Sequence, residues 1–357
     1  SRGLGDVYKR QILLREEVYR ATQGKIDFFQ TPKFVRIARY GKKIQMNEGV
    51  CPAYSDCRMG LSPDKFILSY CDRALGITSA EEQPVLPKGN NLSLHLLELF
   101  TSQVAKVGMT DGIRQVLQEE SDALRAYYEQ AGILIARPAG GTSCRLAISA
   151  KGGTNAENHN HNDVGSYAVA LGSETMVGDQ GGPNSYPGDY FNGDAPQKYK
   201  IKGSFGHPVP VVDGRTQSSG GKAKGVVLQK EFTNEKDVFS IDYTSAYSTP
   251  NLDKLIRTFV YDRQGEGNFT VGDEFTAKTP IRFETAITTR ADWKILDDTH
   301  LLLATDSEQM IVAIEASGKV AFTSETIEVN SPAYTRIGIA LKNQSKEGYI
   351  RLKMYTK

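Results

Sequence analysis

The spacing of hydrophobic residues changes partway along this chain. In the first part, apolar residues recur at intervals of three and four, the period of an amphipathic helix. Thr31 and Pro32 supply a cap and a first-turn proline before FVRIARY, and residues 62–64 (SPD) do the same before KFILSYCDRAL, which Gly76 closes. The same spacing predicts helices in NLSLHLLELFTSQVAKV and DGIRQVLQEESDALRAYY. We therefore expect a helical region over residues 12–130.

From residue 133 onward the period becomes two, and glycines and turn residues separate the segments. Short strands are predicted in ILIAR, RLAIS, SYAVAL, VFSIDY, RTFVYD, NFTVGDEF, IRFETAIT, MIVAIEA, RIGIALK and YIRLKMY. No segment of helical period and length interrupts them, so the sheets should be antiparallel and packed face to face. The expected fold class is α+β multidomain, with a helical domain followed by an antiparallel β-sandwich over residues 131–357.

Length and composition indicate an ordinary globular protein of two domains. The chain has 357 residues, of which 39% are hydrophobic and 24% charged, and its net charge is +1. This balance gives no reason to expect nucleic acid as a partner. No apolar run reaches the roughly 20 residues that cross a bilayer, so no membrane partner is expected, and no signal peptide is visible.

The first residues look foreign to the rest of the chain. Residues 1–11 (SRGLGDVYKRQ) lack a start methionine, show no helical period continuous with the helical pattern after residue 11, and resemble a translated adaptor sequence. We exclude them from the fold prediction and expect the natural chain to begin upstream.

Four cysteines give no disulfide framework. They stand at positions 51, 57, 71 and 144, and the spacing of Cys51 and Cys57 fits no zinc motif. A bridge between Cys51 and Cys57 remains open, although buried or unreactive thiols are favoured.

The most unusual stretch is GGTNAENHNHNDVGSY, residues 152–167, which holds two of the five histidines. Side chains two apart on an extended strand share a face, so His159, His161 and Asp163 are expected to converge on one spot. Such a spot could hold a metal or an anionic substrate.

Two further residues extend this cluster. Asp179 ends a predicted neighbouring strand, and His207 lies further along in the same region. Two imidazoles and a carboxylate are a common zinc ligand set, with a fourth position for water or another ligand. The alternative is that these histidines are ordinary residues held by hydrogen bonds. A cupin is excluded, because Gly165 and Ser166 occupy the positions where its glutamate would stand.

NHNHNDVGSY, then VGDQGG, then GSFGHPVPVVDG resemble the β-sandwich region of the heparinase II/III-like polysaccharide lyases. YYEQAGILIAR is similar to that family's passage from an α/α toroid into the sheets, and GVCPAYSDC to its Pro-x-x-x-Asp loop. LIRTFVYDR and FTVGDEF are similar to its sandwich strands. The resemblance covers most of residues 12–357 and implies that residues 12–130 are the C-terminal part of a truncated toroid.

The resemblance implies β-elimination at a uronic acid of an acidic polysaccharide, such as heparin, heparan sulfate or alginate. Asn158 and His159 would contact the substrate, with His159 able to exchange a proton. His161, Asp179 and His207 would hold a zinc ion that fixes the loops beside the cleft. The resemblance also implies a periplasmic or secreted protein.

Aromatic and basic residues near this cluster are open to two interpretations. By the resemblance, Tyr186 and Tyr190 would contact substrate, and simple packing is the alternative. A basic run with only Asp213 as its acid could bind an anion, although solvated loop lysines explain it slightly better. The run comprises Lys198, Lys200, Lys202, Arg215, Lys222, Lys224 and Lys230.

The family's catalytic tyrosine comes from toroid helices upstream of the Pro-x-x-x-Asp loop, and neither Tyr19 nor Tyr40 is assigned that role here. We therefore expect a lyase as parent protein and an incomplete active site in this chain. Two other classes stay open. One is a non-catalytic, metal-stabilised β-sandwich that binds acidic glycans. The other is a metal-dependent hydrolase or oxygenase with His159, His161 and Asp179 as ligands.

Overall fold

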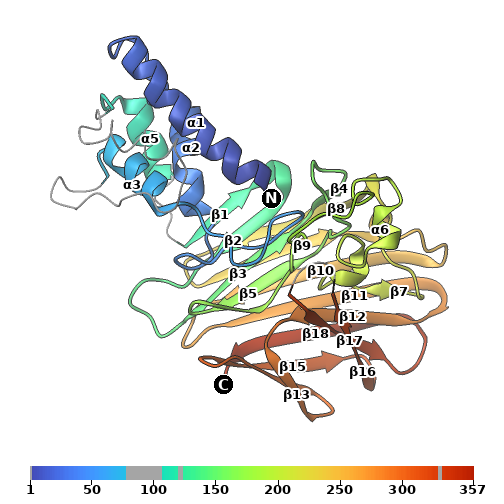
Figure 1. Cartoon of the computed structure of the whole chain (residues 1–357). Helices are drawn as coiled ribbons and strands as arrows, with labels where there is room; N and C mark the ends of the chain where they lie inside the picture. The colour runs from blue at the N-terminus through green and yellow to red at the C-terminus, as the bar shows by residue number, and fades with distance from the viewer. Residues whose placement is uncertain (1, 78–106, 120–123, 329–331) are drawn as a thin grey trace. The chain divides into compact units, whose positions relative to one another are not determined.

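A computed structural model describes residues 2–77, 107–119, 124–328 and 332–357 (Figure 1). The chain forms two compact units. The first comprises Ser1–Gln45 and Ser62–Ala123, and the second comprises Met46–Leu61 and Leu124–Lys357. Residues 46–61 therefore belong to the second unit, although the sequence pattern placed them within the helical region.

The first unit is helical where it is described. Its helices are α1 (Arg2–Ala21), α2 (Pro32–Lys43), α3 (Lys65–Ala74) and α5 (Asp111–Glu119). Asp64 caps α3 by accepting a hydrogen bond from the Phe66 amide at 3.0 Å, and Gly76 lies just past the helix with a positive φ of 65°. Apolar faces meet in a small core that includes Phe29, Val35 and Tyr70. These helices do not establish a toroid, which stays a prediction.

The helical region differs from the sequence pattern in two places. Helix α1 runs without a break through residue 11, although the sequence of residues 1–11 shows no helical period continuous with the pattern after it. Helix α5 ends at Glu119, and the predicted continuation RAYY is instead strand β1 (Arg125–Tyr128), which pairs with β2 (Ile133–Ala136). Its tyrosines suit a half-buried strand, and cross-strand pairing overrides the helical spacing. The helix predicted at residues 91–107 lies almost entirely outside the described residues. Within the described residues, no helix is both long and apolar enough to cross a bilayer.

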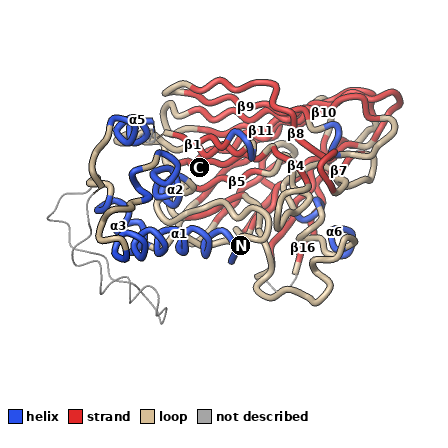
Figure 2. Tube along the Cα trace, turned by 90° about the horizontal axis from the view of Figure 1, so that it is seen from above, coloured by secondary structure: helices blue, strands red, loops and turns tan. Residues whose placement is uncertain are grey.

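The strands of the second unit form three sheets (Figures 1 and 2). Every strand pair within these sheets is antiparallel, as the sequence predicted. The five-stranded sheet has the order β1, β2, β3 (Leu146–Lys151), β5 (Tyr167–Leu171) and β6 (Glu174–Val177). The four-stranded sheet has the order β16 (Val320–Ile327), β17 (Tyr334–Leu341), β12 (Phe283–Thr289) and β7 (Val211–Val212).

The nine-stranded sheet is the largest. Its order is β13 (Asp292–Asp297), β14 (His300–Ala304), β15 (Gln309–Ala316), β18 (Ser345–Thr356), β11 (Asn268–Ile281), β10 (Leu252–Asp262), β9 (Lys236–Asp242), β8 (Gly220–Phe232) and β4 (Gly153–Asn155). Each predicted strand segment lies on one of the observed strands.

Aromatic side chains join the sheets into one core. The ring of Tyr167 on β5 lies 6.2 Å from that of Phe259 on β10 and 5.9 Å from that of Phe269 on β11. Phe275 on β11 stacks on Phe283 of β12 at 4.6 Å. The nine-stranded sheet therefore contacts both smaller sheets, and these residues belong to a single buried cluster.

Residues 46–61 cover the other face of the five-stranded sheet. The Tyr54 hydroxyl lies 2.8 Å from Oγ of Ser149 on β3, and the Asn47 amide donates to the Gly172 carbonyl at 2.7 Å. Strand β3 is accordingly buried on both faces. The four cysteines are free thiols, so the Cys51–Cys57 bridge is absent.

Candidate metal centre and the adjoining histidine

Three loops of the second unit bring His161, Asp179 and His207 together. His161 lies in the loop between β4 and β5, Asp179 lies just past the end of β6, and His207 directly follows a short 3-10 helix, Ser204–Gly206. Each residue offers one ligand atom, and these atoms lie within 4.8 Å of one another. All three side chains are buried. The structure thus assembles the three residues predicted as metal ligands.

Asp179 and His207 form a buried pair. Oδ2 of Asp179 lies 2.8 Å from Nδ1 of His207 and accepts a hydrogen bond from the Ser166 hydroxyl at 3.1 Å, while Oδ1 accepts one from the Gly181 amide at 2.9 Å. Burial opposes the charge on both partners, but their attraction outweighs it. The pKa of Asp179 is therefore lowered and that of His207 raised.

His161 is held in place through its ring nitrogen Nε2. Its Nε2 lies 3.1 Å from Oδ1 of Asp56 and 3.0 Å from the hydroxyl of Tyr190. Burial lowers the pKa of His161, and the nearby His207 lowers it further, so its neutral form is favoured. A neutral imidazole is the form that binds a metal.

The donor set fits a zinc ion. Nδ1 of His161 and Nε2 of His207 are both buried and have no hydrogen-bond partner in the described part of the chain. Unpartnered buried polar atoms are uncommon in proteins, and two imidazoles with a carboxylate are typical zinc ligands. The three residues are therefore close enough together, and of the right chemical type, to hold a metal ion.

His159 lies beside this cluster but outside it. Its side chain is 52% exposed, and its Nδ1 lies 2.9 Å from Oδ2 of Asp56. Its backbone has a positive φ of 60°, a conformation that costs free energy in a non-glycine residue and is concentrated at functional sites. One carboxylate therefore holds both histidines of the motif, His159 through one oxygen and His161 through the other.

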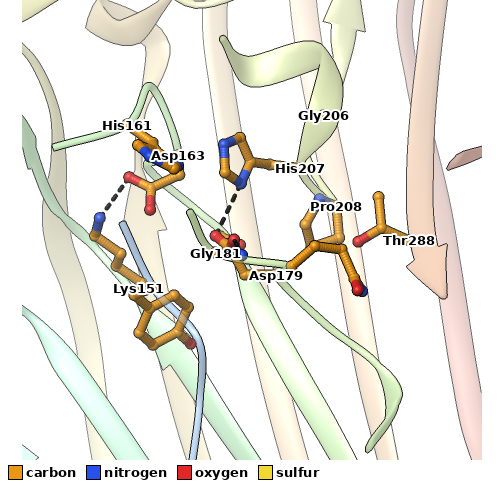
Figure 3. A network of polar contacts seen from close by, with 12 residues as sticks. Lys151, His161, Asp163, Asp179, Gly181, Gly206, His207, Pro208 and Thr288 are labelled. Atoms are coloured by element: carbon orange, nitrogen blue, oxygen red, sulfur yellow. Dashed lines mark hydrogen bonds and ion pairs between the residues drawn. The ribbon is translucent and has the colours of Figure 1, made fainter. Parts of the chain in front are cut away.

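The expectation that His159, His161 and Asp163 converge from an extended strand is wrong. Residues 156–166 form a loop. Asp163 is instead paired with the buried Lys151 on β3 (Figure 3). A second ligand set weighed from the sequence, His159 with His161 and Asp179, is not a metal cluster in the described part of the chain, where His207 takes the place of His159.

Asp56 was not among the residues predicted for the site. It lies in the segment that covers the five-stranded sheet, and two glycines allow this close approach. A Cβ atom at Gly181, whose φ is +68°, would lie 1.5 Å from the Cys57 carbonyl oxygen, and one at Gly182 would lie 2.9 Å from Asp56 itself. The signal that could have found Asp56 was the Pro-x-x-x-Asp spacing that begins at Pro52.

The remaining predicted site residues take different positions. Asn158 is exposed next to His159. Tyr186 is half-buried, whereas Tyr190 is fully buried and uses its hydroxyl on His161, which fits packing and orientation rather than open contact with a ligand. In the basic run, Lys198, Lys200 and Lys230 pair with Asp189, Glu325 and Glu129 respectively.

A buried arginine connects the loops that carry the two histidines of the candidate metal site. Arg257 on β10 pairs with Asp273 through two hydrogen bonds of 2.7 and 2.6 Å. Its Nη1 donates to the carbonyl oxygens of Gly165 and Pro208, each at 2.7 Å. Gly165 belongs to the loop that carries His161, and Pro208 directly follows His207. The guanidinium group of Arg257 thus holds both loops in place.

No family model matches the chain, and no curated protein matches it by sequence. Solved structures are similar in fold. A crystal structure of heparinase III matches with a TM-score of 0.66 and 15% identity, over 99% of this chain and 53% of that one. Heparan sulfate lyase HepC from Pedobacter heparinus matches with a TM-score of 0.65 and 13% identity, over 99% and 52%. The chain spans about half the length of these structures, and at such identity the likeness shows the fold alone.

Proposed function

We propose that this chain is the C-terminal portion of a polysaccharide lyase that cleaves a uronate-containing acidic polysaccharide, of the heparin, heparan sulfate or alginate type, by β-elimination. The observation that carries the proposal is the exposed imidazole of His159 held by the buried carboxylate of Asp56. The fold shared with heparinase III supports the class of enzyme. A periplasmic or secreted location is part of the proposal.

β-Elimination removes the proton at C5 of the uronate, and the electron pair of that C–H bond forms the C4=C5 double bond as O4 departs. Where Nδ1–H of His159 donates to Asp56, Nε2 keeps a lone pair that can accept the C5 proton. Asn158, exposed beside it, offers amide donors to the uronate carboxylate, where negative charge builds up during proton removal. We place the acid that protonates O4 in residues outside this chain.

His161, Asp179 and His207 are the proposed zinc ligands, and a bound ion would supply a structural cross-link between their loops. Contacts within the protein connect these ligands to His159, the residue proposed to meet the substrate. His161 bonds to Asp56, and Asp56 bonds to His159, so fixing the buried imidazole fixes the exposed one. The burial of all three ligands favours a structural role over the activation of water.

The test is to incubate the full-length natural protein and this chain with heparan sulfate, alginate and other uronate polymers, and to follow the ultraviolet absorbance of the unsaturated product. The proposal expects product from the full-length protein, lost on His159→Ala and retained on His300→Ala, a partly exposed histidine of β14. Binding without new double bonds in the full-length protein would identify a non-catalytic glycan-binding module. Cleavage by this chain at ordinary enzyme rates would contradict the placement of the acid elsewhere.

A further inference from the structure

An exposed phenylalanine lies directly beside His159. The side chain of Phe191 is 58% exposed, and its ring centre lies 6.3 Å from that of His159 in an edge-to-face arrangement. Tyr186 and Tyr190 hold the phenylalanine from the protein side, with ring centres 5.1 and 5.4 Å away. Phe191 is thus the exposed member of a cluster of aromatic rings next to His159.

A lysine lies over the same aromatic cluster. Nζ of Lys202 is 5.0 Å from the ring centre of Phe191 and 4.6 Å from that of Tyr190, and it donates to the Tyr190 carbonyl at 2.6 Å. An ammonium group has three donors, so this bond leaves two for a ligand. Among the described residues Lys202 has no carboxylate at ion-pair distance, unlike its neighbours Lys198 and Lys200.

We propose that Phe191 and Lys202 form a binding subsite for an acidic pyranose residue beside His159. The apolar C–H face of the sugar packs against the Phe191 ring, and an anionic oxygen of the sugar, from a carboxylate or a sulfate, pairs with the Lys202 ammonium. The subsite rests on the proposed function, because its ligand is the polymer whose uronate meets His159. Nothing in this pairing requires the chain to cleave the polymer.

Binding by the whole chain tests the subsite without turnover. Affinity for heparan sulfate and for alginate is measured for the unaltered chain and for Phe191→Ala and Lys202→Met, with dextran as the neutral polymer. We expect each variant to bind about tenfold more weakly. Added salt should remove the Lys202 contribution and leave that of Phe191, because salt screens charge. Matched controls at exposed positions outside the cluster, Leu228→Ala on β8 and Lys254→Met on β10, should bind as the unaltered chain does.

The outcomes separate the two proposals. If the unaltered chain binds an acidic polymer and the Phe191 and Lys202 variants bind it equally well, the subsite is wrong and the proposed function stands. If the unaltered chain binds neither acidic polymer, the subsite is wrong, and turnover by the full-length protein decides the proposed function by itself. Selective loss in these two variants supports the subsite, with sulfate as its anion where only heparan sulfate binds and with carboxylate where alginate binds as well.

Discussion

Replacing Arg257 with lysine should loosen the candidate metal site, although Arg257 is not one of its three residues. The five N–H donors of Arg257 make five hydrogen bonds, to Asp273, to Thr285 and to the carbonyl oxygens of Gly165 and Pro208. Lysine has three donors, so at least two acceptors lose a partner. The oxygens of Asp273 keep hydrogen bonds from Tyr243 and Thr285, so the acceptors left unpaired are the two carbonyl oxygens. At about 1–3 kcal/mol for each buried unpaired acceptor, the free energy of unfolding falls by about 2–6 kcal/mol. Most of this range of losses lies below the total stability of an ordinary domain, which is about 5–15 kcal/mol.

The assay is zinc affinity measured by competition with a chromophoric chelator, together with hydrogen exchange of the backbone amides in residues 156–166 and 204–208. Arg257→Lys should weaken zinc binding at least tenfold and speed exchange in both loops, because the carbonyl oxygens that it holds belong to them. Arg263→Lys is the matched control. Arg263 is also buried, pairs with Asp237 and donates to backbone carbonyls, none of them in either loop.

Both variants should lower the melting temperature, so stability alone does not decide the matter. The reasoning about Arg257 is refuted if both variants change zinc affinity alike, or if Arg257→Lys leaves zinc affinity and loop exchange unchanged. Should the unaltered chain bind no zinc, exchange in the two loops still reports whether the arginine holds them.

Three further predictions concern the same site. His161→Ala should abolish stoichiometric zinc in elemental analysis while His300→Ala retains it, and equal zinc in both would remove His161 from the ligand set. Gly181→Ala should lower the melting temperature steeply, since the new Cβ atom would overlap a carbonyl oxygen at positive φ, whereas Gly188→Ala meets open space and should change it little. Zinc affinity should fall as the pH drops from 8 to 6, because the raised pKa of His207 makes protons compete above the ordinary histidine value of about 6.5; an affinity independent of pH over that range would contradict His207 as a ligand.

The sequence by itself determined the type of most β-elements. Segments such as SYAVAL and RTFVYD combine β-branched and aromatic residues with a period of two, and both form antiparallel strands, β5 and β10. Strand β8 was missed because its sequence, GGKAKGVVLQKEF, is rich in glycine and lysine and its side chains are mostly exposed, so no hydrophobic alternation marks it. The histidines and the aspartate also indicated a candidate metal site from the sequence, and the resemblance to the lyases singled out His161, Asp179 and His207, which the structure brings together.

Only the tertiary structure decided how the parts of the site meet. Asp56 is more than a hundred residues away from His159 and His161 along the chain, yet its two oxygens hold both rings. Local spacing suggested instead an extended strand that places Asp163 beside the two histidines. In the structure Asp163 forms an ion pair with the buried Lys151. Side-chain periodicity describes a single element, whereas contacts between distant loops depend on which backbones can approach closely, here at Gly181.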